Sequence, residues 1–153
     1  MKAIILIGIQ GSGKSTFYKK MFADTHVRIN LDMLKNRSRE HAFVQTCVLT
    51  KQPFVADNTN PTLDDRQRYI QTARLNQFKI AGYYFSSDLD SCLERNAKRE
   101  GKKMIPKAGI LSILRKLVVP SKDEGFDELY EVTIDPETNE FITRKTYPND
   151  DAS

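Results

Sequence analysis

Cysteine, histidine and long apolar runs are all scarce in this chain of 153 residues. Its two cysteines, Cys47 and Cys92, lie far apart and match no metal-ligand spacing, which indicates reduced thiols, buried or partly exposed. The two histidines, His26 and His41, have no companions in the sequence for a metal site or a catalytic triad. We therefore interpret both histidines as structural or surface residues.

No apolar run approaches the about 20 residues that a membrane-spanning helix needs. The apolar N-terminal segment has no small-residue cleavage site, so we do not read it as a signal peptide and expect a cytoplasmic protein that enters no membrane. The chain also lacks internal repeats and low-complexity linkers, and its length suits one domain. We predict a single domain over residues 1–147, followed by a flexible tail over residues 148–153.

Glycine is sparse as well, but three of the seven glycines stand in the octapeptide Gly8-Ile9-Gln10-Gly11-Ser12-Gly13-Lys14-Ser15. This string fits the pattern G-x-x-x-x-G-K-[ST], and it lies between a strand-like run and a helix-forming stretch. It therefore predicts a phosphate-binding P-loop, in which glycines free backbone N–H groups to surround the anion at a helix N-terminus. Lys14 is expected against the β- and γ-phosphates of ATP, and the Ser15 hydroxyl is expected on Mg²⁺. The predicted nucleotide-binding residues of the loop are Gly8, Gln10, Gly11, Ser12, Gly13, Lys14, Ser15 and Thr16.

Apolar runs and helix-like stretches alternate along the chain. This alternation predicts an α/β fold of the P-loop kinase type, with a mostly parallel sheet, helices on both faces and a short helical lid over about residues 95–117. Asn60-Pro61 is expected to begin the third helix, and Ser87 with Asp90 to form a capping box for the fourth. Strands are expected at 2–8, 26–30, 53–57, 79–85 and 128–134, a terminal hairpin at 131–134 and 140–146, and helices at 14–23, 32–50, 60–76, 87–99 and 107–117.

Polar residues follow several of the predicted strands, where ligands of open α/β sheets bind. Asp32 is the predicted general base, because an acceptor hydroxyl loses its proton while it attacks the γ-phosphoryl group. A helix cap and a Mg²⁺ ligand acting through water are the alternatives for Asp32. Asp57 ends an apolar strand as a Walker-B carboxylate does, which predicts a metal ligand. Orienting the acceptor or an arginine, and capping the helix at Asn60, are the alternatives for Asp57.

Basic residues gather after the fourth predicted strand. Residues 95–116 hold eight Lys or Arg and one acid, whereas residues 123–151 hold ten acids and two basic residues. Arg95 and Arg99 are four apart on a predicted helix and therefore share a face. A lid that carries them would close over ATP and place a planar guanidinium on the transferring phosphoryl group. The alternative is an exposed helix with surface arginines.

Taken together, these segments resemble the kinase domain of polynucleotide 5′-hydroxyl kinases, the end-healing enzymes of nucleic-acid repair. The resemblance covers roughly residues 1–134. It implies that Lys14 and Ser15 bind ATP·Mg²⁺, that Asp32 is the general base and that Arg99 stabilises the transferring phosphate. The segments that carry it are Gly8–Thr16, Ile29–Asp32, Val55–Pro61, Asp65–Tyr69, Arg95–Arg99 and Ile105-Pro106.

The chain departs from that family at two points. Leu31 stands where members often have an arginine, directly before the base aspartate, which leaves the polynucleotide acceptor open. The Asp-x-Asp-x-Thr motif of the phosphatase domain that many members carry is missing, which implies a kinase unable to remove 3′-phosphates. The predicted acceptor-binding residues are Lys35, Arg37, Asp57, Asn58, Asn60 and Arg68.

We therefore predict a kinase that uses ATP and Mg²⁺ and transfers the γ-phosphate to a 5′-OH nucleic-acid end. A monomer is the favoured oligomeric state. A kinase for a sugar, nucleoside, antibiotic or nucleotide-sugar is the first alternative, which the net charge of +4 also fits. A nucleotide-binding interaction module that uses the terminal hairpin for a partner is the second. The set formed by Asp32, Asp57 and Arg99 favours an enzyme, since such a module has less need of a base.

Overall fold

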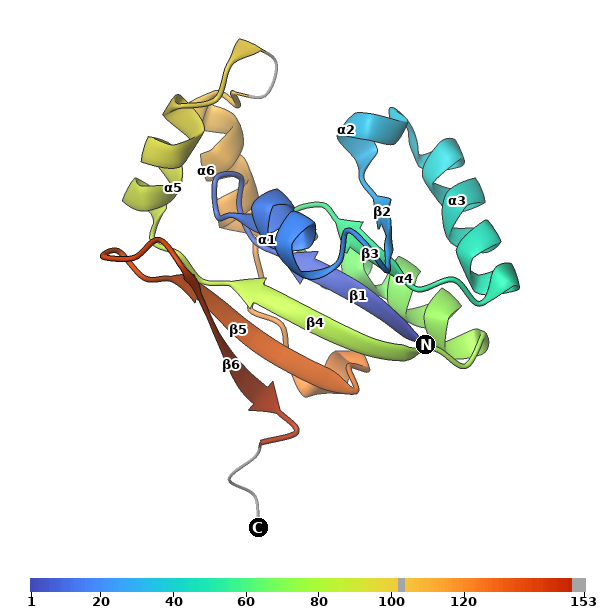
Figure 1. The fold of residues 1–153 in the computed structure, drawn as a ribbon. Coiled ribbons are helices and arrows are strands. Elements are labelled where there is room, and N and C mark those ends of the chain that lie inside the picture. The colour runs from blue at the N-terminus through green and yellow to red at the C-terminus, as the bar shows by residue number, and fades with distance from the viewer. Residues whose placement is uncertain (102–103, 150–153) are drawn as a thin grey trace.

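The computed structural model describes residues 1–101 and 104–149 and contains one six-stranded sheet (Figure 1). The strand order is β2-β3-β1-β4-β5-β6. The first five strands in this order are parallel to one another, and β6 runs antiparallel to β5. This arrangement confirms the predicted α/β fold, the mostly parallel sheet and the terminal hairpin. The strands are β1 (Lys2–Ile7), β2 (Val27–Ile29), β3 (Phe54–Asp57), β4 (Lys79–Phe85), β5 (Glu128–Ile134) and β6 (Phe141–Tyr147).

Helices cover both faces of the sheet because the central strand β1 is apolar on both sides. Ile5 and Ile7 belong to the core that the sheet shares with α3 (Arg37–Thr50) and α4 (Leu63–Leu75). Ile4 and Leu6 face the other way, into the core that includes Phe17 of α1 (Lys14–Met21). Parallel strands buried on both faces read as continuous apolar runs, which is how this strand could be recognised in the sequence.

A pair of helices lies at the carboxyl end of the sheet, above the P-loop (Figure 1). Helices α5 (Leu89–Ala97) and α6 (Lys107–Lys116) pack on each other through a small core that includes Cys92, Ile110 and Ile9 of the P-loop. The side chain of Asn96 fastens the connection, because its amide donates to the Ile105 carbonyl and accepts from the Ile105 N–H. Residues 102–103 of the predicted lid lie outside the described residues, as do residues 150–153 of the predicted tail.

The predicted helix over residues 32–50 is wrong as a single element. The structure has α2 (Leu31–Leu34) and then α3, separated by Lys35 at a φ of 79°. Asn36 caps α3, since its side-chain oxygen accepts from the Arg39 N–H at 2.9 Å. The left-handed lysine and the asparagine cap together end one helix and begin another.

Two other helix ends differ from the prediction. The helix expected from Asn60 begins at Leu63, because Thr62 caps it in a capping box with Asp65. The helix expected over residues 87–99 is capped by Asp88 and ends at Ala97. Arg99 therefore follows α5, and the prediction that it shares a helix face with Arg95 is wrong.

None of the helices in the described part of the chain is long and apolar enough to cross a membrane.

A buried ion pair joins α4 to the segment before β5. Arg66 has no exposed surface, and its Nε lies 2.8 Å from Oε1 of Glu124, a side chain that is 4% exposed. The guanidinium also donates to the carbonyl of Val118 at 2.8 Å. Burial lowers the pKa of Arg66, while the carboxylate of Glu124 opposes that change. The pair therefore fixes the chain that returns from α6 to the sheet.

Replacing Glu124 by glutamine is expected to lower the free energy of unfolding by about 3 kcal/mol, because it leaves the Arg66 charge buried without a partner. Urea denaturation followed by circular dichroism measures this loss. The control is Glu128→Gln, which breaks a pair whose side chains are 46% and 25% exposed and should cost less than about 1 kcal/mol. Equal losses in the two variants would contradict the assignment.

Candidate active site

The P-loop fits so closely against its neighbours that two of its positions require glycine. Gly11 has a φ of 80°, and a Cβ atom there would lie 2.2 Å from the carbonyl oxygen of Cys92. Gly13 has a φ of 97°, and its Cβ atom would lie 3.0 Å from the ring of Phe141 on β6. The Gly8 N–H donates to the carbonyl of Thr59, which ties the loop to the segment after β3. The loop is thus held from three sides, as a rigid anion cradle requires.

Lys14 lies inside the loop and is 8% exposed. Its ammonium donates to the carbonyls of Gly8 at 2.8 Å and Ile9 at 2.9 Å. Burial lowers the pKa of Lys14 to about 8; the negative Asp57 opposes this shift, and the positive Arg99 adds to it. The lysine predicted to bind phosphates therefore lies within the electrostatic reach of both Asp57 and Arg99.

Ser15 and Asp57, the two predicted metal ligands, are brought together by the fold. The Ser15 hydroxyl donates to Oδ2 of Asp57 at 3.1 Å, and the Asp57 side chain is only 2% exposed. A hydroxyl and a carboxylate are oxygen ligands of the kind that Mg²⁺ prefers, so these two side chains fit that ion. In the described residues, no group of three or more His, Cys, Asp or Glu is placed to hold a metal by itself.

Arg28 of β2 completes this cluster, and the sequence analysis missed it. Its Nε donates to Oδ2 of Asp57 at 2.8 Å, and its Nη2 donates to the Ser15 hydroxyl at 3.0 Å. The strand pattern holds the signal that could have found it: Val27 and Ile29 share one side of β2, so Arg28 faces the other, where the P-loop helix lies.

Asparagines join the carboxyl ends of the strands around the loop. Asn30 donates to the carbonyl of Asp57 at 2.7 Å, and its oxygen accepts from the Met33 N–H. Asn58 accepts from the Leu31 N–H at 2.9 Å. Asn60, which is 3% exposed, donates to the carbonyl of Leu6 at 2.8 Å. Asn58 and Asn60, both predicted to bind the acceptor, thus have their amides engaged in holding β1, β3 and α2 together.

Asp32 lies in the first turn of α2 and is exposed. Asn30 caps this helix and Asn36 caps the next one, so the cap alternative for Asp32 is excluded. No hydrogen bond or ion pair joins the Asp32 carboxylate to the rest of residues 1–101 and 104–149. The carboxylate predicted as a base therefore has no partner among the described residues. Capping by Asp57 is excluded in the same way, because Thr62 caps α4.

The two predicted lid arginines lie near the loop in different ways. Arg95 donates from Nε to the carbonyl of Gly11 at 2.6 Å, so it contacts the P-loop directly. Arg99 lies after the end of α5, and its charge contributes to the lowered pKa of Lys14. Arg95 thus contacts the loop itself, and Arg99 lies near enough to act on the lysine inside it.

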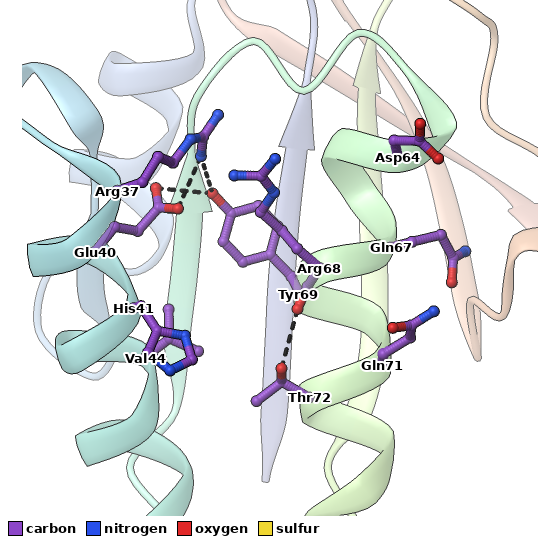
Figure 2. A pocket seen from close by; sticks show the side chains of 10 residues that line it. All are labelled: Arg37, Glu40, His41, Val44, Asp64, Gln67, Arg68, Tyr69, Gln71 and Thr72. Carbon is purple, nitrogen blue, oxygen red and sulfur yellow. Dashed lines mark hydrogen bonds and ion pairs between the residues drawn. The ribbon is translucent and has the colours of Figure 1, made fainter.

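A groove of about 540 Å³ lies between α3 and α4 (Figure 2). Arg37 and His41 line it from α3, and Arg68 and Asp64 line it from α4. Figure 2 shows the side chains of Arg37 and Arg68 pointing toward each other from the two helices. The groove thus brings together two of the predicted acceptor-binding residues, whereas Lys35 lies outside its lining.

The floor of this groove is a buried polar network that was also missed. The Tyr69 hydroxyl donates to Oε2 of Glu40 at 2.9 Å, and Arg37 donates to Oε1 of Glu40 at 2.8 Å. Asn58 donates to the Tyr69 hydroxyl and to Glu40. Burial, followed by the charge of Glu40, raises the pKa of Tyr69, so the phenol stays protonated at neutral pH. Through Asn58, the groove is connected to the start of α2 and hence to Asp32.

Comparison with known proteins identifies the family of the chain. A family model described as an AAA domain (AAA_33) matches residues 4–120. A bifunctional polynucleotide phosphatase/kinase of Schizosaccharomyces pombe is 27% identical over 133 residues, covering 84% of this chain and 33% of that protein. A protein of Acanthamoeba polyphaga mimivirus named "putative bifunctional polynucleotide phosphatase/kinase" is 29% identical over 139 residues, covering 85% and 32%. The chain spans about a third of the length of these relatives, and they confirm the resemblance that its motifs predict.

Solved structures show the same fold at low identity. Kti12 of Chaetomium thermophilum, in complex with ADP-AlF3, superposes with a TM-score of 0.69 at 14% identity and covers 87% of this chain and 89% of its own. A gluconokinase from Sinorhizobium meliloti has a TM-score of 0.60 at 17% identity, with 86% and 82% covered. At such identities the likeness concerns the fold alone.

The lowered pKa of Lys14 leads to a prediction about stability and pH. The unfolded side chain titrates near 10.5 and the folded one near about 8, so the unfolded chain holds more protons between these values. The free energy of unfolding therefore rises with pH through this window. We expect the nucleotide-free protein to gain up to about 3 kcal/mol relative to Lys14→Met between pH 8 and pH 10.5.

Chemical denaturation of both proteins at a series of pH values measures this difference. Lys79→Met, which replaces an exposed lysine of β4, is the control and should show no such gain. A constant difference between wild type and Lys14→Met over the window would show that the ammonium is not desolvated.

Proposed function

The chain belongs to the AAA domain family, and from this premise we propose that it is an ATP-dependent kinase that phosphorylates a 5′-OH end of a polynucleotide. The proposal rests mainly on the carboxylate of Asp32, which is exposed and has no partner in the described residues. Asn30 and Asn58 hold the backbone on either side of Asp32 at the carboxyl edge of the sheet. The relatives named as polynucleotide phosphatase/kinases support the choice of acceptor. We further propose that residues 1–147 act as one monomeric domain with its lid over residues 95–117, in cytoplasmic nucleic-acid end healing.

In the proposed reaction, Asp32 accepts the proton of the acceptor hydroxyl as its oxygen attacks the γ-phosphorus of ATP. A new oxygen–phosphorus bond forms, the bond between the γ-phosphorus and the bridging oxygen breaks, and ADP leaves. Lys14 exchanges the carbonyls of Gly8 and Ile9 for the phosphate oxygens of the nucleotide. Arg99 faces the charge that spreads over the transferring group. Mg²⁺, when bound by Ser15 and Asp57, offsets the charge of the phosphates.

The acceptor strand is proposed to lie along the groove between α3 and α4. Arg37 and Arg68 would then contact its phosphates, with Lys35 near the reacting end. The acidic Asp64 on the same wall favours the alternative of a small uncharged acceptor, since a carboxylate repels phosphate. The two acceptors differ in salt dependence, because only the contacts of a polynucleotide backbone weaken steeply as salt rises.

Asp32→Asn is expected to reduce transfer of labelled phosphate from ATP to a 5′-OH oligonucleotide by at least about 100-fold, because the amide accepts no proton. Binding of ADP, followed as a shift in melting temperature, should be unchanged. Asp24→Asn, which alters an exposed aspartate in the turn after α1, is the control and should keep full activity. Undiminished transfer by the Asp32→Asn variant would exclude it as the base.

Arg68→Gln is expected to raise the KM for the oligonucleotide about fivefold and to leave the KM for ATP unchanged, because it removes one phosphate contact. The slope of log affinity against log salt should fall by about one. Arg144→Gln, on an exposed side chain of β6, is the matched control. An unchanged KM for the oligonucleotide, together with ADP release on small hydroxyl compounds, would favour the alternative acceptor.

A further inference from the structure

Arg28 contacts both candidate metal ligands, although the proposed reaction assigns it no role. Its guanidinium holds the same two side chains that would bind Mg²⁺, the hydroxyl of Ser15 and the carboxylate of Asp57. These three groups form a closed triangle, because Ser15 also donates to the Asp57 oxygen that accepts from Arg28. The positive charge of Arg28 therefore already occupies the oxygens of both candidate metal ligands.

Burial explains why such a partner is needed in the nucleotide-free protein. A carboxylate that is 2% exposed loses most of its hydration and is costly without a nearby positive charge. The ammonium of Lys14 is engaged by loop carbonyls, so Arg28 provides the direct ion pair to Asp57.

The surroundings of Arg28 also allow its side chain to move away from Asp57 and Ser15. Its side chain is 27% exposed, so it can move toward solvent without crossing the core. The ring of Tyr18 lies 5.9 Å from the guanidinium carbon and is fixed by a hydrogen bond from its hydroxyl to the carbonyl of His26. A cation–π contact of this kind is weak at an exposed position, so it guides the side chain and does not lock it.

A divalent cation and the guanidinium cannot both use these oxygens fully. Mg²⁺ requires the lone pairs of its oxygen ligands, and two cations on one carboxylate repel each other. We propose that Arg28 is a resident counter-ion that holds Asp57 and Ser15 until Mg²⁺ displaces it, and so sets the Mg²⁺ concentration at which nucleotide binds. This inference rests on the proposed function only in that the P-loop binds a nucleotide with Mg²⁺.

The test compares wild type with Arg28→Met, which keeps an unbranched, shorter side chain and removes the charge and the hydrogen-bond donors of the guanidinium. Melting temperature is recorded at a fixed concentration of ADP while MgCl₂ is titrated. The midpoint of the Mg²⁺-dependent stabilisation is expected about tenfold lower in Arg28→Met, because no cation competes for the ligands. Arg144→Met, which removes an arginine that pairs with Glu131 on the sheet edge, should keep the wild-type midpoint.

A second readout separates this role from a structural one. Without ADP and Mg²⁺, the Arg28→Met protein should melt several degrees below wild type, and saturating MgADP should restore most of that loss. A merely structural arginine would lower the melting temperature equally with and without the metal. Arg28→Lys keeps the charge and loses one hydrogen bond, so its midpoint should lie between the other two. It decides the question in the same titration if Arg28→Met does not fold.

A Mg²⁺ midpoint that is unchanged or higher in Arg28→Met would overturn the inference, as would a melting temperature that does not respond to MgADP in either protein. The readout uses no acceptor. A chain that binds MgADP but phosphorylates no 5′-OH oligonucleotide therefore contradicts the proposed function alone.

Discussion

The buried carboxylate of Asp57 is the constraint around which the site is organised. A charge at 2% exposure must be neutralised and hydrogen-bonded, and the fold meets that need with one cation from β2 and one hydroxyl from the P-loop helix. The backbone carbonyl of Asp57 also accepts a hydrogen bond from the side-chain amide of Asn30. The same residue thus links β2 and the carboxyl end of β3 to the N-terminus of α1, where the chemistry is proposed to occur.

The asparagines that follow β2 and β3 connect the ends of these strands to the elements around them. Strand ends leave backbone groups without partners, and buried backbone groups require partners. Asn30, Asn58 and Asn60 satisfy three such groups with side-chain amides, each from a different strand or helix. A residue with only a donor or only an acceptor could not bridge in this way, since Asn30 and Asn58 each use both ends of the amide.

The fold was largely predictable because its signals are local. The apolar run of β1 and the spacing of the P-loop depend on neighbours in the chain, and so do the bounds of β4 and β5. The helix ends were less predictable, since Thr62 and Asp88 compete with equally good caps at Asn60 and Ser87. Asn60 loses that competition to a long-range bond with Leu6, which no local pattern reveals.

The candidate site divides in the same way. Lys14 and Ser15 could be named from the spacing of the P-loop motif, and Asp57 from its place at the end of an apolar strand; the structure brings Ser15 and Asp57 together. Arg28, Glu40 and Tyr69 carry no motif, and their importance arises from contacts between elements. Arg99 could be named but not placed, because the end of α5 depends on the packing of the lid.

The hairpin that ends in β6 affects the stage of synthesis at which the P-loop helix is fully packed. Phe141 packs against Phe17 of the P-loop helix and approaches Gly13, although it stands far later in the chain. The helix that presents its N-terminus to the phosphates therefore receives part of its apolar wall from a strand that is synthesised much later than the helix itself. A nascent chain that has completed its nucleotide motif still lacks the apolar surface that packs against α1, so we expect it to bind nucleotide only after β6 has been synthesised.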